Sequence, residues 1–286
     1  MDGVLEAVLQ ALSFGFMRNA LLTGLLVSIA CGVIGTFVVV KRIVFVSGGI
    51  AHAAYGGIGL GYFLGLDPVL GAIAFSLAAA LGMGAVQRRT GERADTLIGV
   101  MWAIGMATGI VLVDLSAGYK ADLMSYLFGS ILAVPSSDLL IMLILDLVII
   151  GAVWLFYKEL VAISFDEVFA TVENVPVNGI YLLLMGLVAL TVVMLMRVVG
   201  LILVIAMLTI PAAISGRFVK DVKKMMILAS VLGMLFTTAG LWLSYFLNVT
   251  SGAAIILFSG VAYLLSLGIQ RLAASSRAGL AGVDRG

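Results

Sequence analysis

The feature that most constrains this chain is a series of about nine apolar stretches, each close to the roughly 20 residues that a helix needs to cross a bilayer. Hydrophobic residues make up 63% of the chain and charged residues 11%, whereas soluble domains are about half apolar and about a quarter charged. Lipid can cover this excess of apolar surface. Because backbone N–H and C=O groups cannot stay unpaired in lipid, the stretches are predicted to be helices. The expected fold is an all-α polytopic membrane bundle.

The second and ninth stretches are short or rich in glycine, which leaves eight spans as the alternative count. We expect residues 1–271 to form a single transmembrane domain and residues 272–286 to form a flexible C-terminal tail. The nine expected spans are Phe16–Val40, Ser47–Leu64, Pro68–Val86, Leu97–Val113, Leu139–Phe156, Val177–Met196, Val198–Phe218, Met225–Leu247 and Ala253–Leu267.

The distribution of Lys and Arg among the connections predicts the orientation, because inner loops carry an excess of these residues. With the N-terminus outside and the C-terminus inside, 13 basic residues lie on the inner side and 3 on the outer side. The inner residues are Lys41, Arg42, Arg88, Arg89, Arg93, Lys158, Arg217, Lys220, Lys223, Lys224, Arg271, Arg277 and Arg285, and the outer ones are Arg18, Lys120 and Arg197. We therefore expect a multi-pass protein of the cytoplasmic membrane.

Two connections are long enough to hold structure of their own. The outer connection, Ser116–Asp138, contains the apolar piece Met124–Val134, which is too short to span. This piece is interpreted either as a re-entrant or surface-lying helix or as a plain loop. In the inner connection, Ser164 is followed three residues later by Glu167, which is the spacing of a capping box. A short helix is therefore predicted to begin there.

This short inner helix would place Phe165, Val168 and Phe169 on one face. An exposed apolar patch usually marks a partner or a membrane surface. The residues alone leave both interpretations open: the patch docks a partner, or its rings lie in the lipid interface.

Glycine and proline predict local features of the bundle. The pairs Gly57–Gly61 and Gly105–Gly109 have the spacing that lets two helices approach closely. Pro211 removes one helical hydrogen bond and predicts a kink in the seventh span.

Few side chains can carry chemistry. His52 is the only histidine, and imidazole suits zinc and several other divalent metals. A polar residue at membrane depth is costly, so His52 is either a functional ligand or a hydrogen-bonded packing residue. Asp146, in the middle of the fifth span, must face the bundle or be protonated. The single cysteine excludes an internal disulfide and a Cys-rich metal cluster. A net charge of +1 gives no attraction for nucleic acid.

Four segments resemble one known family in the family's own order. They are RVVGLILVIAMLTIPAAISGRF (Arg197–Phe218), KRIVFVSGGIAHAAYGGIGLGYFLG (Lys41–Gly65), FDEVFATVENVPV (Phe165–Val177) and NVTSGAAIIL (Asn248–Leu257). These segments are spread over most of the chain and together resemble the zinc/manganese permease family of bacterial and archaeal ABC importers.

The resemblance implies the ABC metal-importer permease fold and a set of partners. It implies a homodimeric permease, two ATP-binding subunits bound inside and an extracytoplasmic metal-binding protein outside. Zinc, manganese or iron would be the transported cargo, with no permanently bound cofactor. The segment 164–175 would couple the permease to the ATPase. The coupling residues would be Phe165, Asp166, Glu167, Val168, Phe169 and Ala170. No G-x-x-x-x-G-K-[ST] loop occurs, so ATP would be used by the partner subunit and the chain is not expected to be an enzyme.

The same resemblance puts His52 on the metal path. Family permeases often carry an Asp one helical turn earlier, and here that position is Gly48. A single histidine cannot form a tight site within one subunit. Two copies of His52 across a dimer axis, or further ligands, would have to complete it. The further candidates are Ser47, Tyr55, Asp114 and Asp146.

Two other function classes compete with this one. An ion-coupled secondary transporter of a metal or small solute would normally show repeated halves and several intramembrane acids. The chain shows one mid-span Asp and no internal repeat. An intramembrane protease would need a G-x-S-x-G or H-E-x-x-H motif, and neither occurs.

Overall fold

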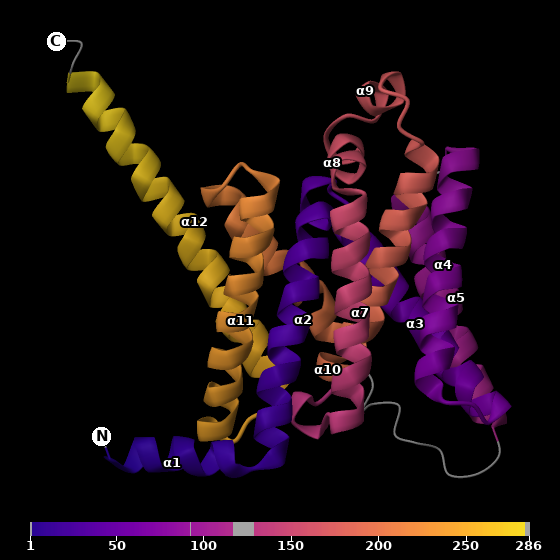
Figure 1. Cartoon of the computed structure of the whole chain (residues 1–286), viewed down its shortest axis with the longest axis horizontal. Coiled ribbons are helices and arrows are strands. Elements are labelled where there is room, and N and C mark those ends of the chain that lie inside the picture. The colour runs from indigo at the N-terminus through magenta and orange to yellow at the C-terminus, as the bar shows by residue number, and fades with distance from the viewer. Residues whose placement is uncertain (1, 92, 117–128, 284–286) are drawn as a thin grey trace.

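In the computed structural model, residues 2–91, 93–116 and 129–283 are described, and every element among them is a helix (Figure 1). The elements are α1 (Asp2–Ser13), α2 (Gly15–Val40), α3 (Val44–Leu64), α4 (Pro68–Thr90), α5 (Ala94–Leu115), the 3-10 helix η1 (Ile131–Ala133), α7 (Ser136–Leu155), α8 (Tyr157–Phe165), α9 (Glu167–Val172), α10 (Val177–Phe218), α11 (Val222–Leu247) and α12 (Ser251–Val283). The expected all-helical bundle is confirmed.

Among the described residues, eight helices are long and apolar enough to span a membrane. The sixth and seventh expected spans form the two arms of α10, which are Val177–Met196 and the shorter Leu203–Phe218. At 1.5 Å per residue the second arm is about 24 Å long, slightly less than a typical hydrocarbon core. The count is therefore eight full spans and one short one.

The break in α10 lies at Gly200, which has φ 73° and ψ 173°. This region of backbone space is open essentially to glycine alone. The kink expected at Pro211 is wrong in position, because Gly200 is the residue whose dihedral angles leave the helical range within α10. The ring of Pro211 removes one N–H, but the helix continues past it to Phe218.

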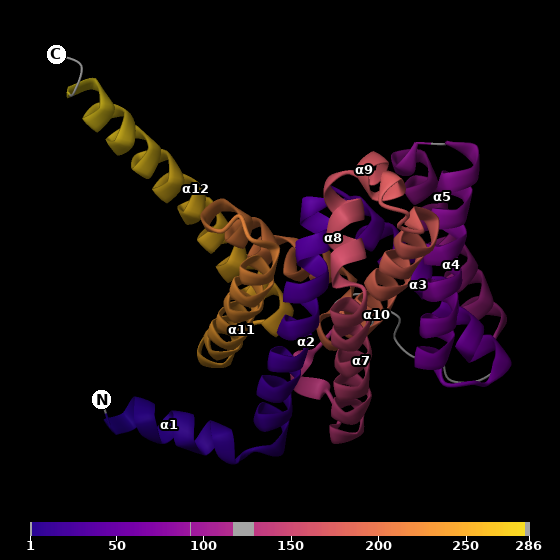
Figure 2. The same cartoon turned by 45° about the horizontal axis from the view of Figure 1, so that its top comes forward.

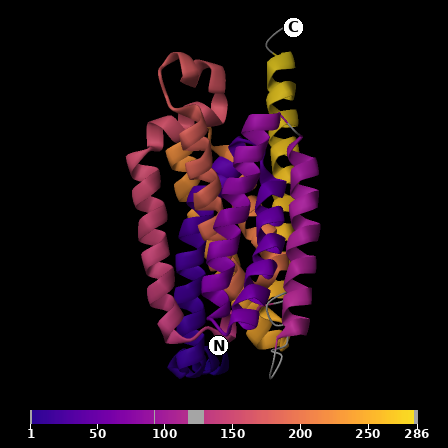
Figure 3. The same ribbon diagram turned by 90° about the vertical axis from the view of Figure 1, so that its right-hand side faces the viewer.

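All the connections expected on the inner side lie at one end of the bundle, which we call the basic end. This end carries α8, α9, the turn between α10 and α11, and the C-terminal part of α12 (Figures 1 and 3). The N-terminus and α1 lie at the opposite end. Successive spans thus run in opposite directions, as the distribution of Lys and Arg among the connections predicted.

Helix α1 was not anticipated from the sequence. It lies across the spanning helices at the end opposite the basic end (Figure 1). Phe14 and Phe16 follow it and stack with 5.4 Å between ring centroids. Leu9, Phe14 and Phe16 are all exposed. Such a helix suits the membrane surface, where an apolar face meets lipid and a polar face meets water.

Helix α3 is the most buried of the spanning helices and packs against α4, α5 and α10. Its glycines permit this packing. A Cβ at Gly57 would overlap the backbone of Gly71, and one at Gly59 would overlap the backbone of Gly109. One at Gly105 would overlap the backbone of Ala53. The close approach predicted from the glycine pairs is confirmed, and it fixes α3 tightly between α4 and α5.

Two expected segments lie partly or wholly outside the described residues. The first five residues of Met124–Val134, the expected re-entrant or surface helix, lie outside the described residues, and the described remainder contains η1. Asn19 Nδ2 donates to Val134 O at 3.2 Å and to Ser136 Oγ at 3.0 Å, which ties this part to α2. The tail expected from residue 272 is helical as far as Val283, and its flexibility stays a prediction.

Candidate metal path and coupling surface

His52 lies in the middle of α3, partly buried, with its ring stacked on Trp102 of α5. The ring centroids are 3.7 Å apart and the planes differ by 24°. Nδ1 lies 2.8 Å from the carbonyl oxygen of Gly48. Because a carbonyl only accepts, Nδ1 must carry the proton in this contact. The lone pair of the neutral ring therefore sits on Nε2, which is the nitrogen available to a metal. Trp102 was missed by the sequence reasoning.

Position 48, where the family resemblance implies a carboxylate, is filled by a neighbour. A Cβ at Gly48 would lie 2.9 Å from Cδ1 of Ile205 and 3.9 Å from Cζ3 of Trp102. Ile205 belongs to the second arm of α10, so this arm closes over the turn before His52. The side chain of Ile205 thus occupies the space that a carboxylate at position 48 would need.

Ser47 and Tyr55 share α3 with His52 and are buried. The Ser47 hydroxyl donates to the carbonyl of Val44 at 2.7 Å, so its proton is used within its own helix. The Tyr55 ring packs at the level of Gly109 on α5. Both residues are near His52 in the chain, and both serve the packing of α3.

The two acidic candidates lie elsewhere. Asp114 is exposed near the C-terminal end of α5, twelve residues beyond Trp102 and so about 18 Å further along the helix axis. Asp146 is 2% exposed in α7, which packs on α2 and α10. Asp146 therefore faces the bundle and not lipid, as expected for a mid-span carboxylate.

The structure does not assemble these side chains into one metal site. Within the described ranges, no group of three or more His, Cys, Asp or Glu residues could hold a metal ion. In one subunit, His52 offers one nitrogen ligand without a carboxylate partner from α5 or α7. Such an arrangement favours passage of an ion over retention of it.

At the basic end, the chain turns through α8 and α9, and the residue that caps α9 differs from the expected one. Asp166 accepts hydrogen bonds from the backbone N–H groups of Val168 at 2.9 Å and Phe169 at 3.0 Å. The capping box assigned to Ser164 and Glu167 is wrong. Ser164 still belongs to α8, where its hydroxyl donates to the carbonyl of Leu160 at 2.6 Å. An Asp directly before a helix is an equally good cap.

An exposed apolar patch covers α9 and the end of α8. Phe165, Val168, Phe169 and Val172 have exposed fractions of 65%, 76%, 57% and 73%. Val168, Phe169 and Val172 lie on α9, and Phe165 is the last residue of α8, one residue before the extended Asp166. Helix α9 lies at the tip of the basic end above α7 and α8 (Figures 1 and 2). Ala170, by contrast, is fully buried. We call these four exposed side chains the apolar patch.

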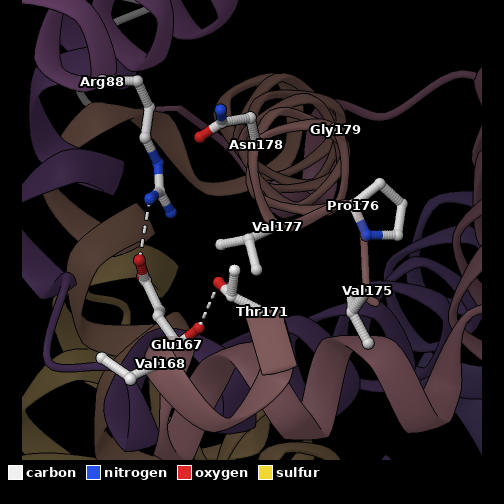
Figure 4. Close-up of a pocket in the computed structure, with 9 residues that line it drawn as sticks. All are labelled: Arg88, Glu167, Val168, Thr171, Val175, Pro176, Val177, Asn178 and Gly179. Atoms are coloured by element: carbon white, nitrogen blue, oxygen red, sulfur yellow. Dashed lines mark hydrogen bonds and ion pairs between the residues drawn. The ribbon is translucent and has the colours of Figure 1, made fainter. Parts of the chain in front are cut away.

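Glu167 anchors the apolar patch to the bundle instead of pointing outward. Its Oε2 accepts from Arg88 Nη1 at 2.7 Å (Figure 4), and its Oε1 accepts from Lys41 Nζ at 2.5 Å. Lys41 also donates to the carbonyl of Ile163 in α8 at 2.7 Å. Lys41 is the C-terminal cap of α2 and Arg88 lies in the last turn of α4, so one carboxylate joins α9 to both helices. We call Glu167, Lys41 and Arg88 the ion-pair clamp.

The clamp rests on an aromatic ring of α10. The guanidinium carbon of Arg88 lies 4.2 Å from the ring centroid of Tyr181, whose hydroxyl donates to Gln87 Oε1 at 2.8 Å. Beside it, Arg88, Glu167, Thr171 and Asn178 contribute to the lining of an open pocket of about 540 Å³ (Figure 4). The sequence reasoning used Lys41 and Arg88 only for orientation. Their basic charge next to an acidic inner helix was the signal that could have found the clamp.

The clamp has an expected pH dependence. Burial alone would raise the pKa of Glu167, but hydrogen bonds and charge from Arg88 and Lys41 hold this pKa below its usual range. A lowered carboxyl pKa stabilises the fold above the unfolded-state value, near 4.3, and the stabilisation is lost as the pH falls through the lowered value. At pH 7, Glu167→Gln should lower the thermal midpoint slightly. The loss should be on the order of 1 kcal/mol or less, because the Glu167 side chain is 38% exposed and screened by water.

Thermal unfolding of the purified chain between pH 7 and pH 3.5 measures this effect. The gap between wild type and Glu167→Gln should close as the pH falls below about 4. Glu173→Gln, at the exposed C-terminal end of α9, is the matched control and should track the wild type. A gap that stays constant down to pH 3.5 would show that the charge of Glu167 does not stabilise the fold.

Comparison with known proteins gives the family. Residues 13–270 match the profile of the ABC 3 transport family, which is most of the chain. The chain belongs to the ABC 3 transport family. It is therefore a multi-pass membrane permease subunit of an ABC transporter complex and has no catalytic role of its own.

Relatives in the ABC 3 transport family align over nearly the whole chain. An uncharacterized membrane protein of Synechocystis is 59% identical over 268 residues, covering 94% of this chain and 95% of the relative. The manganese transport system membrane protein MntC of Listeria monocytogenes is 36% identical over 262 residues, covering 92% of each. The chain thus aligns with more than nine tenths of the length of each of these two relatives.

A solved structure agrees with this assignment. The structure of PsaBC from Streptococcus pneumoniae in complex with Fab contains a chain that is 35% identical, with a TM-score of 0.82. The match covers 92% of this chain and 95% of that chain. The expected ABC metal-importer permease fold, given by resemblance from the sequence, is confirmed.

Proposed function

We propose that this permease carries divalent transition-metal ions inward across the cytoplasmic membrane, with manganese as the first candidate. One observation carries the proposal: the chain aligns over 92% of its length with a relative named as a manganese transport system membrane protein. Zinc and ferrous iron remain the alternatives, because imidazole binds all three metals. An ion-coupled secondary transporter is not favoured, because the family is one of ABC transporters.

The chemistry along α3 supports a metal in transit. His52 presents Nε2 as its available lone pair, and Trp102 holds the ring in one orientation. The metal ion would bind this single nitrogen. Water molecules, or His52 of a second copy, would supply the other ligands. Ser47 and Tyr55 would contribute weakly, since their main contacts are within the helix packing. Within the described part of the chain, His52, Asp114 and Asp146 do not form a group that could hold a metal ion.

The two ends of the bundle suit two kinds of partner. The apolar patch on α9 is proposed to dock an ATP-binding subunit, and a homodimer of permeases would dock two of them. The ion pairs of Glu167 support this role, because they hold α9 in place before docking. Binding to an element that is already ordered costs less conformational entropy. An extracytoplasmic metal-binding protein would approach the opposite end, where α1 lies.

The proposed orientation places the basic end in the cytoplasm, and cysteine labelling tests it. In a Cys31→Ser background, a cysteine at position 67 should react with an impermeant reagent from outside, and cysteines at positions 90 and 221 only from inside. Asp67, Thr90 and Asp221 are all exposed, and Cys31 is buried. Labelling of position 221 from outside intact cells would reverse the orientation.

Tracer uptake tests the cargo. The permease, its ATPase and its metal-binding protein would be reconstituted in vesicles and given radioactive manganese, zinc or ferrous iron. We expect the vesicles to take up manganese. Unlabelled manganese should reduce this uptake more than magnesium or calcium does. Uptake of none of the three transition metals would refute the proposed cargo.

A further inference from the structure

A second cavity lies on the outer surface of the bundle, away from His52 and from the clamp. It measures about 940 Å³ and runs between the C-terminal end of α7 with α8 on one side and α11 on the other. Helix α2 lies between α7 and α11 and forms its back wall, as the order of these helices in Figure 1 shows. Its lining residues include Val33, Ile150, Val153, Trp154, Met226 and Ile227. We call this cavity the lateral groove.

The walls of the lateral groove are apolar and its outer edges face away from the bundle. Trp154, Ile227 and Ile150 are 80%, 66% and 40% exposed. Val153 and Met226 at its base are buried. These residues belong to helices long and apolar enough to span, so the groove lies on a surface that lipid covers. Trp154 is the next-to-last residue of α7, where exposed tryptophan is typical of the headgroup region.

The mouth of the lateral groove is basic and lies at the basic end of the bundle. Lys158 from α8 and Lys223 from α11 line it and are both exposed. Lys223 Nζ lies 4.9 Å from the ring centroid of Tyr157, which holds this ammonium group over the groove. Glu159 also contributes to the lining. Two lysines from different helices thus converge above an apolar channel, and two acidic groups, Glu159 and Asp221, lie nearby.

We propose that the lateral groove binds an anionic phospholipid. The headgroup phosphate would lie between Lys158 and Lys223, and an acyl chain would lie against Trp154, Ile150 and Ile227. Basic pockets between spanning helices select anionic headgroups, because each lysine near the phosphate adds electrostatic attraction. A free phosphate would leave the apolar channel uncovered. A neutral lipid would bring no net negative charge to the two ammonium groups.

The bound lipid would link helices that do not otherwise meet closely. One lysine comes from the α7–α8 corner and the other from the start of α11, on either side of α2. The lipid would thus bridge the segment that leads into α9 and the helix that follows the second arm of α10. The site needs neither the metal path nor the partners proposed above, so it is tested on this chain alone.

Lipid retention tests this proposal. The full-length chain would be purified in detergent, stripped of lipid, titrated with phosphatidylglycerol or phosphatidylcholine, and examined by native mass spectrometry. Phosphatidylglycerol should bind at one saturable site and phosphatidylcholine should not. Each of Lys158→Gln and Lys223→Gln should weaken binding about 5-fold, and the double variant roughly 25-fold, from the attraction each lysine supplies. Arg93→Gln, a basic residue that does not line the groove, is the matched control and should bind as the wild type does.

Four outcomes would overturn the proposal. Equal retention of phosphatidylglycerol by the double variant and the wild type would place the lipid elsewhere. Equal binding of both lipids would remove the anionic preference. In a Cys31→Ser background, efficient disulfide formation between two copies carrying Trp154→Cys would show that a second copy covers the lateral groove. Competition by inorganic phosphate at equal concentration would show that the site takes free anions instead of lipid.

Discussion

Replacing Phe165 and Phe169 together by alanine should leave the permease folded and inserted but separate it from its ATPase. Both rings are more than half exposed, at 65% and 57%, so their loss costs little packing within the chain. Aromatic residues at the centre of an interface typically contribute about 2 kcal/mol each to binding. The double variant should therefore retain less than about a tenth of the ATPase that copurifies with the wild type, and metal uptake should fall with it.

The matched control is Phe14→Ala with Phe63→Ala. These rings are 42% and 47% exposed and lie at the end opposite the basic end. This control should keep the ATPase bound and transport near the wild-type rate. Full copurification and uptake by the Phe165/Phe169 double variant would mean that the apolar patch meets lipid and not the ATPase.

The second large effect is expected at His52. His52→Ala removes the nitrogen ligand from the metal path while leaving a small residue in a glycine-rich helix. Uptake of the metal should fall strongly, by tenfold or more if the ligand contributes about 1.4 kcal/mol to the rate-limiting passage. Expression, dimerisation and basal ATP hydrolysis should change little. His52→Asp keeps a side chain that can bind metal and should retain more uptake than His52→Ala.

Asp146→Asn is the comparison for His52→Ala, because it changes a buried carboxyl group on α7, a different helix from the one that carries His52. Its uptake should stay near that of the wild type. If His52→Ala transported normally and Asp146→Asn did not, the path would run beside α7. If His52→Ala failed to fold, the ring would serve the stacking on Trp102 and not the metal.

Much of the fold was predictable because a bilayer fixes the length and the backbone of each span. The expected first span, Phe16–Val40, differs from α2 by one residue at its start, since an apolar run ending at Lys41 leaves little choice. The sixth and seventh spans were expected to divide between Met196 and Val198, and the break lies nearby at Gly200. The helix is continuous through Pro211, where the kink was expected. Gly200 and Pro211 both disturb a helix, and sequence alone does not reveal which one the neighbouring helices hold in a bent shape. Helix α1 was missed because a short surface helix lacks the length signal of a span.

The site was less predictable because it depends on pairs of residues far apart in the chain. Phe165, Val168 and Phe169 are exposed, but the single helix expected to carry all three is wrong, because Phe165 ends α8 and the other two lie on α9. The role of Glu167 did not follow from helical spacing, because its partners Lys41 and Arg88 come from two other helices. The stacking of His52 on Trp102 and the filling of position 48 by Ile205 are likewise tertiary contacts without a local signature.

ATP-dependent uptake of radioactive manganese into vesicles that contain the complete complex tests the central claim most directly. Uptake should require ATP inside the compartment that holds the ATPase. It should stop with an ATPase that cannot hydrolyse ATP, and it should persist when proton and sodium gradients are dissipated. Manganese uptake that continues without ATP hydrolysis and collapses with an ion gradient would contradict the account.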